Sequence, residues 1–183
     1  MKIYTRQKTD KYIAESKQLE NEYKDACDWI NSFGINYKIT RFGNYEQDVE
    51  SFLNGQDELS AKESVKTFMN AHLEANELIR LKNTFDSFDS SELEESIKKI
   101  ASGQRYRNAS KTDQSRDFAF ELNIASRFAK AGFSIDLKGI SDVVVQIENR
   151  KLFVECKRLK SYKQLEKRVR AANVQISKRL TSE

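Results

Sequence analysis

Three polar residues in the last third of the chain have types and spacing suited to phosphodiester hydrolysis. Asp142 is followed, after twelve residues, by Glu155 and Lys157. Carboxylate oxygens are ligands that Mg²⁺ prefers, and a bound Mg²⁺ polarises a phosphate and lowers the pKa of a bound water. A lysine near the ion can orient or deprotonate the attacking water and offset charge in the transition state. These residues predict metal-dependent hydrolysis with Asp142 and Glu155 as ligands of Mg²⁺, or alternatively of Mn²⁺.

A β-hairpin over residues 142–158 is expected to bring these residues together. Asn149-Arg150 separates two mostly apolar runs, and a two-residue turn there places Asp142 directly opposite Lys157. Because side chains alternate between the two faces of a strand, Glu155 then shares a face with both. The alternative is an ordinary cross-strand ion pair between Asp142 and Lys157, with Glu155 facing solvent.

Glu121 adds a carboxylate on the helix that is expected to precede this hairpin. Residues 113–131 have helical periodicity, and Glu121 lies in the middle of their apolar arc although the opposite face is polar. Because an unpaired buried charge is strongly unfavourable, Glu121 needs either a salt bridge with a core lysine or arginine or a metal ion. The arc consists of Phe118, Phe120, Leu122, Ile124, Ala125, Phe128 and Ala129, and the polar face of Asn123, Ser126, Arg127 and Lys130.

The elements around these residues predict a mixed α+β core. The helix at 113–131 is followed by expected strands at 133–137, 141–148 and 152–158 and by a closing helix at 162–180. This order indicates a three-stranded mixed or antiparallel sheet with helices packed on it. The residues expected to form the buried stripe of the closing helix are Leu165, Val169, Ala172, Ile176 and Leu180.

The N-terminal part of the chain predicts helices without a recognisable motif. A polar, glycine-containing stretch at 102–112 is the only credible boundary, so we expect a helical region over 1–108 and the α+β core over 109–183. An alternative is that the helical region is itself the functional part, as an interaction or dimerisation surface. The elements expected there are helices at 6–32, 45–53 (capped by Asn44), 60–81 and 91–101, and a short strand at 35–39.

Basic charge is concentrated at the C-terminal end of the chain. Residues 150–183 hold eleven lysines and arginines against three glutamates, whereas residues 1–149 hold 21 basic and 25 acidic residues. Such a segment is either a solvated helix face or a surface for a polyanion, and beside the candidate site it favours nucleic acid, for which we expect DNA. The residues expected to contact it are Arg158, Lys160, Arg168, Gln175 and Arg179.

The composition argues against several other classes of protein. The single histidine, His72, excludes histidine-based triads and histidine-rich zinc sites, and Cys27 and Cys156 are too few for a disulfide framework. No apolar run approaches the roughly 20 residues of a membrane helix, and the first residues lack the apolar stretch of a signal peptide. We therefore expect a cytoplasmic protein without a membrane partner.

Asp142 and the Glu155-Cys156-Lys157 triplet resemble the signature of the PD-(D/E)XK, restriction-endonuclease-like nuclease superfamily. The expected order of elements over about 113–180 is similar to that family's core. The resemblance implies that Glu121 assists the site and that Gln175 matches a glutamine that some branches carry on the following helix. Ser141 stands where the family's name has proline. No strand follows the last helix, so the core is truncated before its last strand unless residues 35–39 or another subunit supply an edge.

Together these observations predict a metal-dependent endonuclease in which Glu121, Asp142, Glu155 and Lys157 are the catalytic residues, with Glu121 acting on the metal directly or through water. The alternative is a non-catalytic nucleic-acid-binding or assembly module that retains the nuclease fold. A homodimer formed through the helical region or through the unpaired sheet edge is compatible with both.

Overall fold

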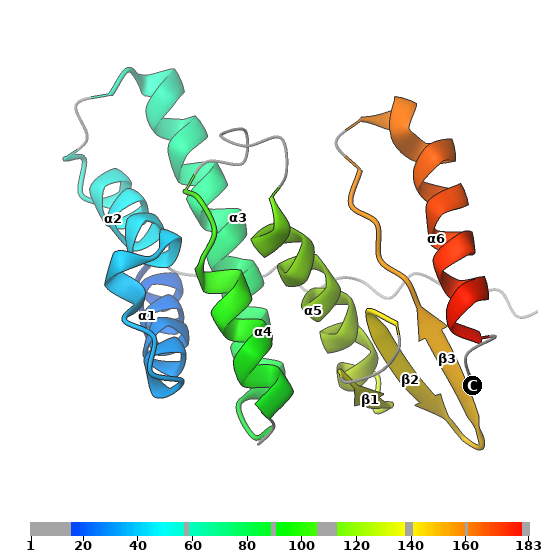
Figure 1. Cartoon of the computed structure of the whole chain (residues 1–183). Coiled ribbons are helices and arrows are strands. Elements are labelled where there is room, and N and C mark those ends of the chain that lie inside the picture. The colour runs from blue at the N-terminus through cyan, green and yellow to red at the C-terminus, as the bar shows by residue number, and fades with distance from the viewer. Residues whose placement is uncertain are drawn as a thin grey trace, which may run out of the picture.

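A computed structural model of the chain describes residues 16–56, 59–88, 91–105, 113–137, 141–159 and 161–180. Within these residues, helices precede and follow a small sheet (Figure 1). Figure 1 labels the α-helices and strands used below. The elements in chain order are α1 (Ser16–Ser32), η1 (Tyr37–Ile39), α2 (Arg41–Leu53), α3 (Ala61–Phe85), α4 (Ser91–Ala101), α5 (Gln114–Lys130), β1 (Ser134–Asp136), β2 (Val143–Ile147), β3 (Arg150–Val154), η2 (Tyr162–Gln164) and α6 (Leu165–Leu180).

The mixed α+β composition is confirmed, with a helical N-terminal part followed by helix, three strands and helix. Helices α1, α3 and α4 lie where periodicity predicts them, although α3 extends to Phe85 and the part of the first expected helix before residue 16 lies outside the described residues. None of the described helices has an apolar stretch long enough to cross a membrane.

The strand expected at 35–39 is wrong, and so is the suggestion that it supplies a sheet edge. Tyr37–Ile39 forms a 3-10 turn, begun by Asn36, whose side chain accepts a hydrogen bond from the Lys38 amide at 3.2 Å. Helix α2 follows at once and is capped by the Thr40 hydroxyl, which accepts from the Phe42 amide, so Asn44 is not the cap. The alternating apolar pattern was misleading because Tyr37 is buried whereas Ile39 is 84% exposed.

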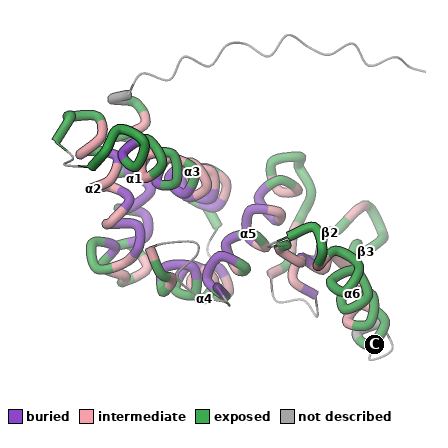
Figure 2. The backbone as a smooth tube through the Cα atoms, turned by 90° about the horizontal axis from the view of Figure 1, so that it is seen from above, coloured by how far each residue is buried: buried purple, intermediate pink, exposed green. Residues whose placement is uncertain are grey.

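Helix α5 lies at the centre of the fold. It packs against α3 and α4 on one side and against β1 and β2 on the other, and Ala119, Leu122 and Ala125 are buried in these contacts. One hydrophobic core runs from Tyr23 on α1 through α5 to Val145 on β2. Figure 2 shows the buried positions gathered where the helices face one another, whereas α6 is largely exposed.

The three strands form an antiparallel sheet in the order β1-β2-β3. The expected hairpin is confirmed, but its turn is Glu148-Asn149 rather than Asn149-Arg150, and Glu148 has a positive φ of 52°. Ile147 therefore pairs with Arg150 and Val144 with Phe153, a register two residues away from the expected one. A shift of two residues leaves every side chain on the same face of the sheet. The alternation of apolar and polar residues therefore could not distinguish the two registers.

Helix α6 follows η2 and lies on the side of β3 away from α5 (Figure 1). Its expected buried stripe is wrong in part, because Leu165 and Val169 are 38% and 48% exposed and only Ala172 and Ile176 are partly buried. The helix is amphipathic, but the described residues cover its apolar side only partially. For Leu180 the structure gives the helical backbone alone.

Candidate functional site

The structure brings Asp142, Glu155 and Lys157 together at the open end of the hairpin. Asp142 precedes β2, and Glu155 and Lys157 follow β3. The Lys157 ammonium lies 2.5 Å from Glu155 Oε1 and 3.9 Å from Asp142 Oδ2, and the Glu155 side chain is fully buried. An ammonium beside two carboxylates offsets the repulsion that would otherwise separate them.

A side-chain to backbone hydrogen bond holds Asp142 in place. Its Oδ2 accepts from the Cys156 amide at 2.7 Å, which joins the segment before β2 to the segment after β3. The expected direct pairing of Asp142 with Lys157 in the strand ladder is wrong, because β3 ends at Val154 and the register is shifted by two residues. The hydrogen bond to Cys156 gathers the same residues in its place.

Glu121 lies on α5, close enough to Asp142, Glu155 and Lys157 for their charges to affect its pKa. Partial burial, with a smaller contribution from the negative charge of Asp142, raises the pKa of Glu121 to about 7 against the opposing effect of the Lys157 ammonium. No hydrogen bond or ion pair joins Glu121 to another described residue, so the structure does not provide the core salt bridge that was one of its two expected partners.

The faces of α5 differ from the expected pattern. Asn123 and Ser126, predicted on the polar face, are buried, and Arg80 on α3 donates a hydrogen bond to Asn123 Oδ1 at 3.3 Å. Phe120, predicted in the apolar arc, is 37% exposed. A helix packed on two sides buries more of its circumference than one apolar stripe, so Glu121 lies at the flank of the buried face rather than at its middle.

The residues present fit a magnesium site in which the protein supplies only a few of the ligands. Mg²⁺ is commonly held by one or two carboxylates and completes its coordination with waters and substrate phosphates. Asp142 and Glu155, both beside the Lys157 ammonium, provide such a pair. The described residues contain no group of three or more histidine, cysteine, aspartate or glutamate side chains arranged around one point.

The described residues among those predicted to bind nucleic acid lie on the irregular segment after β3 and on α6. The Arg158 Nε lies 3.1 Å from Asp117 Oδ1 on α5, so this guanidinium forms a structural ion pair. On α6, Arg168 is exposed and Gln175 is partly buried. Lys160 lies outside the described residues, and for Arg179 the structure gives only the helical backbone.

A buried polar network at the start of α5 was not predicted from the sequence. Asp113 caps the helix by accepting from the Arg116 amide at 3.3 Å, and its carboxylate also pairs with the Arg116 guanidinium. Arg116 in turn donates to Glu74 on α3 and to the Tyr45 hydroxyl on α2. The Asp113–Arg116 spacing is a detectable helix-start signal, but the distant partners are not.

Comparison of the chain with protein-family models, with curated proteins and with solved structures finds no match. Inference about function therefore rests on the side chains and their geometry.

Proposed function

We propose that the chain is a Mg²⁺-dependent nuclease of the PD-(D/E)XK type that hydrolyses phosphodiester bonds of nucleic acid, with DNA as the substrate. The observation that supports this most is that Lys157 lies 2.5 Å from Glu155 and 3.9 Å from Asp142 at the open end of the hairpin, while the charges of Asp142 and Lys157 affect the pKa of Glu121 on α5.

In this proposal Asp142 and Glu155 are the metal ligands. A bound Mg²⁺ would polarise the phosphate and lower the pKa of a bound water. Lys157 would turn from Glu155 towards the phosphate and offset the charge that develops on its oxygens. The Glu121 carboxyl, with a pKa of about 7, exchanges a proton near neutral pH and can accept one from the attacking water.

Helix α6 supports nucleic acid as the substrate. Lys163 just before it and Lys167, Arg168 and Arg170 within it are exposed, and such groups neutralise phosphates without reading sequence. Arg170 also pairs with Glu166 at 2.5 Å, which leaves the other three cations for a polyanion.

The decisive experiment is nicking of supercoiled plasmid DNA by the purified full-length chain with Mg²⁺ and with EDTA. We expect nicking that requires Mg²⁺ and is lost in Glu155→Ala and in Lys157→Ala. The matched control is Lys151→Ala, which removes an exposed lysine of β3 and should leave the rate unchanged. Equal nicking by wild type and both site variants would exclude this site as the source of the activity.

A second candidate is a non-catalytic nucleic-acid-binding module. The contact of Lys157 with buried Glu155 favours it, because a lysine in that place neutralises the carboxylates without a metal. In that case gel-shift binding of duplex DNA would be insensitive to EDTA and would weaken with salt, and no condition would produce nicks.

A further inference from the structure

A separate pocket of about 390 Å³ lies in the helical part of the chain, between α2, α3 and the segments that precede and begin α5. Its volume falls within the range of small-molecule sites. None of the four candidate nuclease residues lines it, so it does not depend on the proposed function. Its lining residues are Tyr45, Asp48, Leu59, Glu63, Lys66, Thr67, Asn70, Ala71, Glu74, Arg105 and Arg116.

One end of the pocket is a rigid, buried polar surface. Tyr45, Glu74 and Arg116 are 2%, 3% and 4% exposed. The Arg116 Nε donates to Glu74 Oε1 at 2.9 Å, and its Nη2 donates to the Tyr45 hydroxyl at 2.7 Å and to the Arg105 carbonyl at 3.0 Å. Apolar residues of similar size often stabilise a fold as well as buried ion pairs do, so stability alone does not account for this network. It provides preorganised polar walls.

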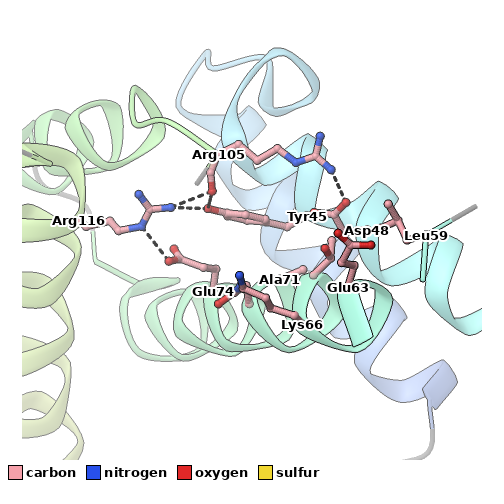
Figure 3. Close-up of a pocket in the computed structure, with 11 residues that line it drawn as sticks. Tyr45, Asp48, Leu59, Glu63, Lys66, Ala71, Glu74, Arg105 and Arg116 are labelled. Atoms are coloured by element: carbon pink, nitrogen blue, oxygen red, sulfur yellow. Dashed lines mark hydrogen bonds and ion pairs between the residues drawn. The ribbon is translucent and has the colours of Figure 1, made fainter. Parts of the chain in front are cut away.

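The other end carries two carboxylates. Figure 3 shows Tyr45 extending across the space above α3, with Arg116 and Glu74 at one end and Asp48 and Glu63 at the other. The Arg105 guanidinium pairs with Asp48, whereas among the described residues Glu63 accepts a hydrogen bond from the Ser60 hydroxyl alone, at 2.5 Å. Burial raises the pKa of Asp48 even with Arg105 beside it. This end therefore favours a second cationic group.

The floor of the pocket offers donors for which the described part of the chain provides no acceptor. Lys66, Thr67 and Asn70 lie along one face of α3, and none of them forms a hydrogen bond or ion pair with another described residue. With Asp48 paired to Arg105 and Glu74 to Arg116, the charges left for a ligand are the Lys66 ammonium and the Glu63 carboxylate. The pocket thus presents one charge of each sign, on adjacent turns of one helix.

We propose that this pocket binds a small zwitterion, an α-amino acid. Its ammonium group would lie between Asp48 and Glu63, its carboxylate would accept from Lys66 and Asn70, and its side chain would lie along Tyr45, Leu59 and Ala71. An inorganic anion is a poorer ligand because Asp48 and Glu63 would repel it. A simple amine is a poorer ligand because it has no negative charge to pair with Lys66.

The test is binding of the twenty standard L-amino acids to the full-length chain, by thermal shift followed by calorimetry. At least one amino acid binds saturably, and its decarboxylated amine and deaminated acid each bind at least about tenfold more weakly, because each loses one charge-assisted interaction. Lys66→Met lowers the affinity by a similar factor. Lys62→Met, an exposed lysine on the same helix that does not line the pocket, leaves the affinity unchanged.

Three results would overturn the proposal. They are the absence of saturable binding by any of the twenty at millimolar concentration, equal affinities of the Lys66→Met and Lys62→Met variants, and tighter binding of inorganic phosphate than of every amino acid. Circular dichroism of both variants shows whether each keeps the helical fold, and Asn70→Leu repeats the test at a second exposed donor if Lys66→Met unfolds.

Discussion

Arg158 and Asp117 form an ion pair in which Arg158 Nε lies 3.1 Å from Asp117 Oδ1. Asp117 is one turn before Glu121 on the same face of α5, and Arg158 follows Lys157 directly. The pair therefore connects the helix that carries Glu121 to the segment that carries Glu155 and Lys157, although this segment has no regular secondary structure of its own.

We predict that Asp117→Asn lowers the rate of plasmid nicking about threefold to tenfold while its melting temperature stays close to that of wild type, because an exposed ion pair contributes at most about 1 kcal/mol to stability. Arg158→Gln should lower the rate equally. If Arg158→Gln also weakens DNA binding in gel shifts whereas Asp117→Asn does not, Arg158 contacts phosphate instead of positioning the segment.

Glu121→Gln should stabilise the fold at high pH. The folded pKa of Glu121 is raised to about 7, so the folded state holds its proton more tightly than the unfolded state does. This favours folding below the unfolded value near 4.5, and the advantage is lost as pH rises through 7. In EDTA at pH 8 the melting temperature of the variant should be a few degrees above that of wild type, since each kcal/mol of unfolding free energy shifts it by about 2–4 °C. Near pH 4 the two proteins should melt at the same temperature. The control is Glu95→Gln on α4, an exposed position that is not part of the candidate site, melted in the same two buffers.

Asp142→Asn should separate the structural role of this residue from metal binding. The amide oxygen of asparagine can still accept from the Cys156 amide, so the melting temperature in EDTA should stay close to that of wild type. Wild type should gain thermal stability when Mg²⁺ is added, because ligand that binds only the folded state shifts the unfolding equilibrium. The variant should lose that gain, and Asp142→Ala should lose both the gain and part of the stability in EDTA. A Mg²⁺-induced shift that persists in Asp142→Asn would argue against Asp142 as a ligand.

Arg116→Met should destabilise the whole chain by about 3–5 kcal/mol in urea denaturation, because it leaves Glu74 and Asp113 buried without their main cation. The control is Arg127→Met, an exposed arginine on the same helix, for which we expect a change within about 0.5 kcal/mol. A small effect at Arg116 would mean that water replaces the guanidinium.

Local features of the candidate site were predictable from the sequence, and long-range ones were not. Helix α5, the hairpin and the shared location of Asp142, Glu155 and Lys157 follow from periodicity, because a register error of two residues changes no face. The partner of Arg158 was missed because Asp117 is 41 positions earlier in the chain. Its pairing depends on how α5 packs on the sheet, which periodicity does not specify.

The helical part was harder to predict for the same reason. Tyr45, Glu74 and Arg116 come from three helices and meet only when the bundle has closed. Each of these residues, taken alone, is ordinary for a surface position. The turn at Tyr37–Ile39 was missed because three residues with an apolar-polar-apolar pattern fit a strand and a helical turn equally well.

The central place of α5 also affects how the chain unfolds. Its buried side chains Ala119, Leu122 and Ala125 belong to the one core that runs from α1 to β2. Separating the helical part from the sheet would expose this face on one side or the other, so neither part can melt while the other keeps its full set of contacts. The elements that share this core should therefore lose structure in one cooperative transition, with identical midpoints for the tryptophan fluorescence of Trp29 and for the main transition in the helical circular dichroism.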